Sequence, residues 1–245
     1  MPTGHARGPW DPGQLHGGAP AALVAEAVQE DGYLVARITF DFLAPVPLAP
    51  LTVSARTTKP GRNVQLAEAE VHADGATVLR ARAMRLRRAA VKLPALERDD
   101  PPPAPSTGHH DPFPARGGPA EGFHLTGMEI RFLDEGGYGA GPSLAWFRLA
   151  RPLIDDQEPS PLARALAAAD FGNGVSRAVD FDAYLFINTD LTLHLHREPE
   201  GEWVLLDART RLEPNGAGLA ESALSDERGR IGIAAQSLFV AARDR

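Results

Sequence analysis

Residues 51–86, LTVSARTTKPGRNVQLAEAEVHADGATVLRARAMRL, and residues 204–239, VLLDARTRLEPNGAGLAESALSDERGRIGIAAQSLF, share one pattern. Sliding the chain by 153 residues superposes them without a gap, and seven of the 36 positions are identical. Short breakers such as Lys59-Pro60-Gly61 separate strand-like runs within the first stretch. Because the same order of predicted elements occurs in both halves, we predict an internal repeat.

Each half contains a predicted helix, over Gly17–Gln29 and over about Pro161–Asp170. Most of the remaining runs are rich in strand-forming residues bounded by turn signals. We predict strands over Tyr33–Phe42, Leu51–Thr57, Val64–His72, Thr77–Leu86, Met128–Leu133, Ser143–Leu149, Tyr184–His196, Glu202–Arg211, Leu219–Ser225 and Ile231–Val240. One helix followed by antiparallel strands, used twice, is an α+β plan, in which a long sheet curls around central helices.

A segment dense in Pro and Gly and poor in large apolar residues divides the chain between the two repeats. Such a segment cannot bury enough surface to offset its ordering entropy, so we interpret it as a linker. The predicted organisation is an N-terminal unit at 1–88, a linker at 89–122 and a C-terminal unit at 123–245 that carries the chemistry.

Composition excludes several classes of protein. The net charge of −7 argues against nucleic-acid binding, which needs a basic surface. The absence of Cys excludes a thiol nucleophile and a disulfide framework. No apolar run approaches the ~20 residues that span a bilayer, and the N-terminus lacks an apolar signal segment. We therefore expect a cytoplasmic protein that does not enter membranes.

Strand alternation selects two polar side chains for attention. Thr210 shares a face with Val204, Leu206 and Ala208, and Gln236 lies among apolar neighbours on its own strand. A buried amide or hydroxyl without a partner costs roughly 1–3 kcal/mol, so each group must be satisfied by the other, by water or by substrate. Alternation alone equally allows both to be structural.

Asp190 lies in the run FINTDLTLHLH, where alternation groups it with Thr192, His194 and His196 on a polar face. It would reach a cleft only from the start of the strand or from a bulge. His194 and His196 have metal-ligand spacing, but with no Cys and no matching acidic partner we predict no metal. Gly174-Val175-Ser176 lacks the closing glycine of a serine-hydrolase elbow, and no glycine-rich phosphate loop is present.

INTDLTLHLHR, the following EWVLLDARTRLEPNGAGLAESALSDERGRIG, and AAQSLFV resemble the C-terminal half of the acyl-CoA thioesterase II family. GPWDPGQLHGGAPAAL and ADFGNG also resemble motifs of bacterial relatives in that family. The resemblance implies a tandem hotdog fold and hydrolysis of acyl-CoA without a cofactor. It also implies that an Asp, a Thr and a Gln orient the water, carried over here to Asp190, Thr210 and Gln236.

The developing oxyanion needs free N–H groups, which a helix N-terminus supplies. Two helix entries qualify, at His16-Gly17-Gly18 and near Ser160, and we prefer the first because its glycines permit close approach. Family members usually carry a strand ahead of the first helix, and GHARGPWDPG is a poor strand. Under the repeat shift Thr210 maps to Thr57 but Gln236 maps to Ala83, so we predict one working site per chain.

Two other functions stay open. A non-catalytic acyl-binding module would bind acyl-CoA without turnover. Enoyl-CoA hydration on the same fold usually needs an Asp–His pair near the central helix, and the second-half helix offers Asp170 but no His. Association into a homo-oligomer is also expected to be possible, since hotdog proteins commonly associate through sheet edges.

Overall fold

The computed structural model describes residues 1–96, 99–113 and 119–243. Its helices are α1 (Gly18–Val28), α2 (Pro161–Ala169) and α3 (Gly172–Val175), with the short turns η1 (Gly4–Ala6), η2 (Pro105–Thr107) and η3 (Phe123–Gly127). Its strands are β1 (Tyr33–Phe42), β2 (Thr52–Lys59), β3 (Val64–Ala73), β4 (Ala76–Arg87), β5 (Met128–Phe132), β6 (Ser143–Leu149), β7 (Tyr184–Asn188), β8 (Asp190–Leu195), β9 (Val204–Leu212), β10 (Ala217–Asp226) and β11 (Gly229–Ala242).

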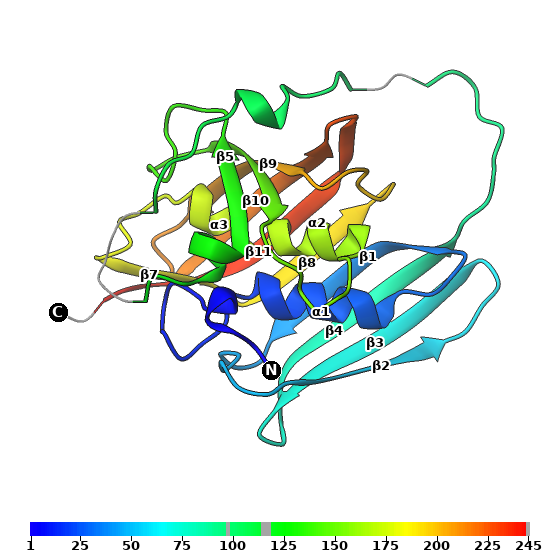
Figure 1. Cartoon of the computed structure of the whole chain (residues 1–245), viewed down its shortest axis with the longest axis horizontal. Helices are drawn as coiled ribbons and strands as arrows, with labels where there is room; N and C mark the ends of the chain where they lie inside the picture. Colours follow the sequence, from blue (N-terminus) through cyan, green and yellow to red (C-terminus); the bar gives the residue numbers. More distant parts are fainter. Residues whose placement is uncertain (97–98, 114–118, 244–245) are drawn as a thin grey trace.

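The strands form one antiparallel sheet in the order β2-β3-β4-β1-β8-β11-β10-β9-β6-β5, with β7 also paired to β11. The first four strands of this order come from the first repeat and the others from the second. Helices α1 and α2 lie side by side against one face of the sheet (Figure 1). The predicted α+β plan of a sheet around central helices is confirmed, and the sheet runs without a break from one repeat into the other.

The two repeats meet where β1 pairs with β8. Thr39 lies opposite Thr192, and the Thr192 hydroxyl donates to the Thr39 hydroxyl at 3.1 Å. These two residues are 153 positions apart, which is the repeat shift. On either side, Arg37 pairs with His194 and Asp41 with Asp190. We call this β1–β8 ladder the seam. Exchanging the two repeats leaves its residue pairs unchanged, so a pseudo-two-fold axis passes between the two threonines.

Small residues let α1 and α2 approach closely. The buried face of α1 consists mainly of alanines, and α2 buries Ala163, Ala165 and Ala167 completely. A Cβ built on Gly18 would lie 2.9 Å from the carbonyl oxygen of Ala167. The end of α1 meets the start of α2 as well, since Gln29 Nε2 donates to the Ser160 hydroxyl at 2.9 Å, so the two helices run antiparallel.

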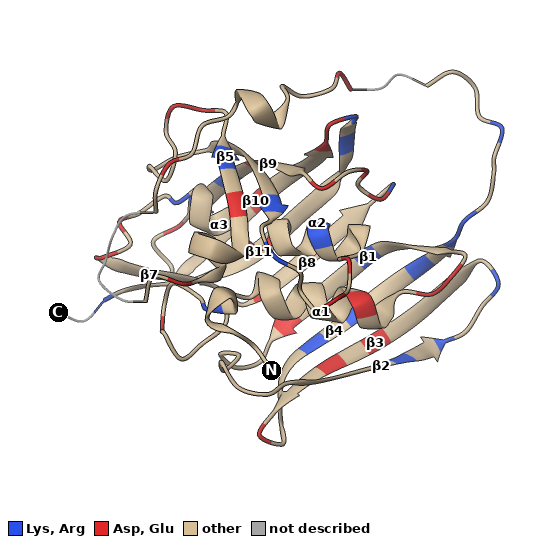
Figure 2. Ribbon diagram, viewed as in Figure 1, with Lys and Arg blue, Asp and Glu red and all other residues tan. Residues whose placement is uncertain are grey.

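The sheet has one apolar face and one charged face. Strand β3 alternates strictly, with Ala67, Ala69 and Val71 buried beneath α1. Between them, Glu68 and Glu70 face outward, where Glu68 pairs with Arg56 and Arg82 and Glu70 with Arg80. Figure 2 shows these charges as stripes along β3 and β4. Such exposed pairs contribute little to stability, and they keep the outer face soluble.

The two parts of the predicted linker differ in their contacts with the rest of the molecule. Residues 88–96 are exposed, and in Figure 1 this part of the chain arches along the outside of the molecule. The later part packs on the second repeat: the Trp146 indole donates to the Pro103 carbonyl at 2.9 Å, and His109 pairs with Phe132. Phe113 then reaches the ring of Tyr138 at 5.1 Å. The later part of the segment therefore contacts the second repeat at a few points, while most of its described residues stay exposed.

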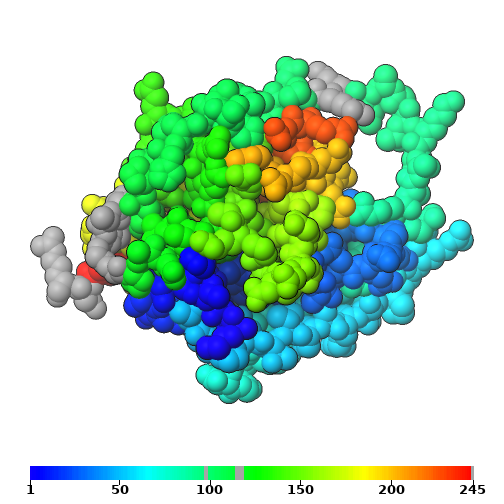
Figure 3. All heavy atoms as spheres, in the orientation of Figure 1, coloured from blue at the N-terminus to red at the C-terminus, as the bar shows by residue number. Residues whose placement is uncertain are grey.

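The segment ahead of α1 contains no strand longer than isolated bridges. It holds η1 and a bridge between Arg7 and Leu15, and it packs on η3 through Phe123 N–H donating to the Arg7 carbonyl. In Figure 3 the dark-blue N-terminal segment lies against the green segment that contains η3. Across the described residues no helix combines the length and apolarity that crossing a membrane requires.

The contact between α1 and α2 yields a stability test. We expect Gly18→Ala to lower the free energy of unfolding by about 1–3 kcal/mol, because the new methyl group forces the helices apart. Gly174→Ala is the matched control, since a Cβ at Gly174 meets only open space and alanine favours the helix. Urea unfolding measures both. Equal stability of Gly18→Ala and wild type would contradict the close packing.

Candidate functional site

A cavity of about 330 Å³ opens beside the N-terminal end of α1. The segment before α1, the loop after β1, η3, α3 and β7 supply its walls. Most of its lining is aromatic or aliphatic, and its polar groups gather where α1 meets the end of α2. The polar residues of the lining are Gln14, His16, His124, Tyr138, Asp170, Asn173, Arg177, Asn188 and Thr189.

Asp170 is the centre of this polar group. It caps the C-terminal end of α2, and only 4 % of its surface is exposed. One carboxylate oxygen, Oδ1, accepts from Asn188 Nδ2 at 2.8 Å and from Gln236 Nε2 at 3.3 Å. The other, Oδ2, lies 2.9 Å from His16 Nδ1. Four elements of the fold thus hold one buried carboxylate at the wall of a cavity.

A break in the predicted strand over 184–196 brings Asn188 to this position. Asn188 pairs with Leu238 while Leu195 pairs with Gly232, so β7 and β8 differ by one residue in their register on β11. Thr189 is the extra residue. A one-residue shift exchanges the two faces of a strand. The bulge therefore turns Asn188 toward the helices, while Leu191 continues the inner face beyond it.

Gln236 lies directly behind Asp170. It is 2 % exposed, and its Nε2 also donates to the Asp170 carbonyl at 3.3 Å. Its Oε1 accepts from the N–H of Asn173 in α3 at 3.2 Å. The amide is fully used by these partners, so it positions Asp170 and α3 relative to the sheet.

The helix entry brings His16, Gly17 and Gly18 to the same place. The N–H of Gly18 donates to His16 Nδ1 at 3.1 Å. Nδ1 has a single bonding position in the ring plane, so it donates to Asp170 when protonated and accepts from Gly18 when not. A Cβ on Gly17 would lie 2.9 Å from Asp170 Oδ2. The positive end of α1 therefore faces the carboxylate directly, which stabilises negative charge there.

Gly17 also offers a free donor. His16 N–H bonds to the Ala6 carbonyl, and Ala19 N–H bonds to the His16 carbonyl. Within the described chain the Gly17 N–H forms no hydrogen bond, and Gly17 lines the cavity. A free N–H at a helix entry is the kind of donor that stabilises a developing oxyanion.

Asp190 lies elsewhere. Its carboxylate accepts from the N–H of Ser237, and its pairing with Asp41 places it on the outer, charged face of the sheet. Alternation predicted this face, and the bulge that could have turned Asp190 inward comes one residue earlier. The side chains of Asp190, Thr210 and Gln236 therefore do not converge on one point in this structure, and the role of the three residues in catalysis stays a prediction.

Thr210 lies on the inner face with Gln236, as alternation predicted. Both residues pair with Ala220 on the strand between them, so two strand spacings, or roughly 10 Å, separate their backbones. The Thr210 hydroxyl bonds to the Ser176 hydroxyl at 2.8 Å, and Ser176 donates to the Gly172 carbonyl. These bonds hold Thr210 beneath α3, and Thr210 forms no hydrogen bond with Asp170.

A second histidine faces the cavity from η3. Burial, helped by the nearby His16, lowers the pKa of His124 to about 3, so its imidazole is neutral at physiological pH. Its Nδ1 is buried and has no partner among the described residues. Its ring meets the edge of Phe113 at 4.5 Å. Burial also raises the pKa of the neighbouring Tyr138, which keeps that phenol protonated.

The first repeat lacks these groups at the equivalent positions. A bulge between Val35 and Arg37 matches the one at Thr189, but Val35 stands where the second repeat has Asn188. Ala83, 1 % exposed, stands where the second repeat has Gln236. At the entry to α2, the Ser160 hydroxyl caps the helix and Glu26 accepts from the Ser160 N–H at 2.8 Å. A side-chain carboxylate of the chain itself thus occupies the second helix entry.

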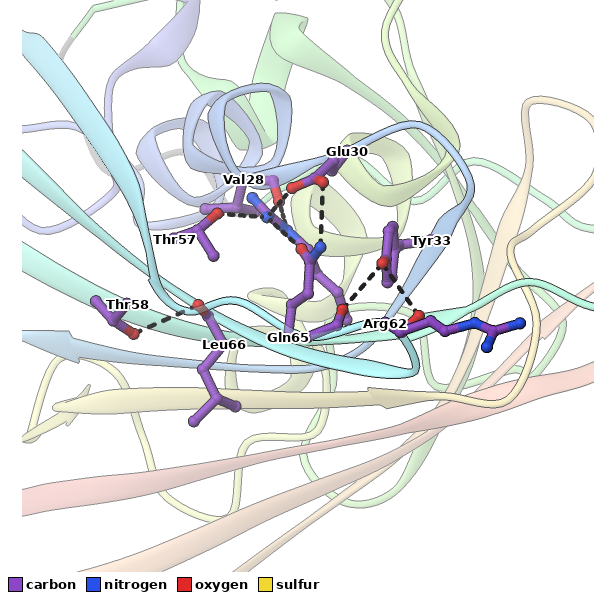
Figure 4. Close-up of polar contacts among 10 residues, drawn as sticks. Val28, Glu30, Tyr33, Thr57, Thr58, Arg62, Gln65 and Leu66 are labelled. Carbon is purple, nitrogen blue, oxygen red and sulfur yellow. Dashed lines mark hydrogen bonds and ion pairs between the residues drawn. The ribbon is translucent and has the colours of Figure 1, made fainter.

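An arginine fills the corresponding interior. Arg85, 4 % exposed, donates to the Val28 carbonyl at the end of α1, to Glu30 at 2.6 Å, to Thr57 at 3.0 Å and to Gln65 at 3.1 Å. Figure 4 shows these partners converging from the helix end and the neighbouring strands. Thr57 is the repeat equivalent of Thr210. The place of a second site is therefore occupied by a satisfied buried cation.

Sequence reasoning named Asp170 and His16 but never joined them. The sequence prediction considered only a histidine on the same helix as Asp170. In the structure the histidine is His16, which belongs to the other repeat. The sequence signals were ADFGNG and LHGGAP, both already noted as motifs. Asn188 was missed because a one-residue bulge has no signature in strand alternation.

Comparisons with known proteins agree with this architecture. A model of the acyl-CoA thioesterase N-terminal domain matches residues 6–86, and one of the acyl-CoA thioesterase C-terminal domain matches residues 96–240. No curated protein sequence matches the chain significantly.

Solved structures resemble the whole chain. A protein assigned as a thioesterase II from Thermobifida fusca YX has a TM-score of 0.74 at 21 % identity, covering 99 % of this chain and 91 % of its own. A hot dog protein from Alicyclobacillus acidocaldarius gives 0.69 at 18 %, covering 99 % and 91 %. The acyl-CoA thioesterase II TesB2 of Mycobacterium marinum gives 0.65 at 17 %, covering 93 % and 88 %. These likenesses concern the fold, whereas the two domain models show that the chain belongs to the acyl-CoA thioesterase family.

Proposed function

We propose that this protein hydrolyses acyl-CoA to a carboxylic acid and free CoA, with Asp170 as the base. One observation carries the proposal. Asp170 is a buried carboxylate held by Asn188, Gln236 and His16 at the bare N-terminal end of α1, on the wall of an apolar cavity. The family membership supports the thioester as substrate.

We infer that the attacking water binds to Asp170. A carboxylate has roughly four lone-pair sites, and Asn188, Gln236 and His16 use three of them. The remaining site is on Oδ2, next to Gly17. A water bound there is oriented toward a carbonyl whose oxygen accepts from the Gly17 N–H. Positioning and partial proton removal are what a thioester needs, because its thiolate is already a good leaving group.

The proposed steps balance. Asp170 takes a proton as the water oxygen bonds to the carbonyl carbon, and the carbonyl oxygen becomes an oxyanion at the Gly17 N–H. When the oxyanion collapses, the carbon–sulfur bond breaks, and the proton held by Asp170 returns to the departing sulfur. Gln236 and Asn188 keep Asp170 fixed throughout.

Hydration of an enoyl-CoA is the second candidate, because His16 and Asp170 form the Asp–His pair that sequence analysis lacked. The two reactions separate cleanly in one assay. Hydrolysis releases CoA thiol, whereas hydration consumes the conjugated double bond and leaves the thioester intact. A non-catalytic module would bind acyl-CoA and do neither.

Two matched substitutions test the assignment of Asp170 as the base. We expect Asp170→Asn to reduce kcat by about 100-fold or more, the usual contribution of a general base. Asp190→Asn makes the same chemical change on the outer face and should leave kcat within about twofold of wild type. Release of CoA thiol from acyl-CoAs ranging from acetyl to stearoyl measures both variants.

The opposite result, loss of turnover in Asp190→Asn and retention in Asp170→Asn, would restore the assignment made from sequence. Turnover by wild type with equal rates in both variants would keep the reaction and reject both residues as the base. Circular dichroism and urea unfolding establish that each variant is folded.

We also propose one working site per chain, because Glu26 and Arg85 occupy the equivalent positions in the other half. Titration with a non-hydrolysable CoA thioether, followed by calorimetry, should give a stoichiometry of one ligand per chain. A stoichiometry of two would show that the Arg85 network opens for a ligand.

A further inference from the structure

The cavity is walled chiefly by aromatic rings that come from separate parts of the chain. Trp10 precedes α1, Phe113 belongs to the linker, Tyr138 follows β5, and Phe181 and Phe186 flank the start of β7. At about 330 Å³ the volume lies at the lower end of the usual range for ligand pockets, roughly 300–1,000 Å³. The space therefore favours a compact group over a long chain.

The rings form a continuous shell with defined geometry. Trp10 stacks on Phe181 with centroids 4.2 Å apart, and Phe186 meets both rings edge-on at 5.2 and 5.7 Å. Phe113 meets Tyr138 edge-on at 5.1 Å and Phe181 at 6.4 Å. These edge-to-face contacts extend around the wall, so a flat ring inside would continue the same pattern.

Aromatic walls discriminate between guests of equal apolar area. A straight alkyl chain gains only from leaving water. An aromatic guest gains in addition from edge-to-face and offset contacts with surrounding rings. His124 extends the same shell, since its neutral imidazole packs edge-on to Phe113 and carries no charge that would repel an apolar ring.

We propose that the acyl group taken by this cavity is a compact aromatic one, of the phenylacetyl class, in preference to a straight fatty acyl chain. This inference rests on the proposed thioesterase function, since the thioester places the acyl group in the cavity beside Asp170.

The first test compares kcat/KM for phenylacetyl-CoA, octanoyl-CoA and palmitoyl-CoA. We expect phenylacetyl-CoA to exceed both by at least about tenfold. Equal or higher values for octanoyl-CoA would overturn the aromatic preference and leave the thioesterase function intact. Absence of turnover with every thioester would instead overturn the proposed function.

A binding measurement tests the preference without turnover. Calorimetry with the thioethers S-(2-phenylethyl)-CoA and S-octyl-CoA avoids the scissile carbonyl altogether. The phenylethyl compound should bind at least about tenfold more tightly. Octyl binding of equal or greater affinity would overturn the proposal, whatever the hydrolysis assay gives.

Variants link the preference to the wall. Trp10→Leu and Phe113→Leu should each lower the phenylethyl-to-octyl affinity ratio by at least about threefold, because leucine keeps apolar contact and removes the ring. Phe239→Leu is the control: Phe239 is 52 % exposed on the outer face and should leave the ratio unchanged. A ratio that stays constant in both wall variants, with folding verified by thermal unfolding, would show that the rings do not select the guest.

Discussion

The antiparallel ladder between β1 and β8 joins the two repeats, and its register determines where each helix lies. With Thr39 opposite Thr192, the repeats are related by a two-fold axis, and the entry of one helix must meet the end of the other. The glycines at the start of α1 then allow the approach that puts Gly17 against Asp170. A carboxylate from one repeat and a helix entry from the other share one site only because this seam holds.

Much of the fold could be predicted because strand alternation and turn residues are local properties. The boundaries of β1 and β6 were predicted to the residue, and the repeat shift of 153 carries β3 exactly onto β10. The site could be predicted only in part. Gln236 and the His16-Gly17-Gly18 entry were selected by buried polarity and by helix physics. Asp170 and Asn188 depended on a contact across the seam and on a bulge, neither of which leaves a periodic signal.

The two halves show how one sequence pattern supports different interiors. In the second repeat, buried polar groups converge on Asp170 and leave one side of it open to the cavity. In the first, the guanidinium of Arg85 is surrounded by oxygen atoms from Val28, Glu30, Thr57 and Gln65. A buried cation is tolerable only with such partners: removing Glu30 would leave its charge unpaired, and removing Thr57 or Gln65 would leave an N–H without an acceptor. The Arg85 network therefore fills the interior of the first repeat and has a structural role.

The packing of Phe113 has a consequence for how this protein can change over time. The described residues of the segment that carries Phe113 contribute no strand to the sheet beyond the bridge at His109, so the length and composition of the segment can vary while the register of the strands is kept. A wall of the cavity is thus supplied by a connecting segment, and such segments generally tolerate insertion and deletion. Substitutions in this segment can change the selectivity for the acyl group without changing Asp170, the entry to α1 or the pairing of β1 with β8.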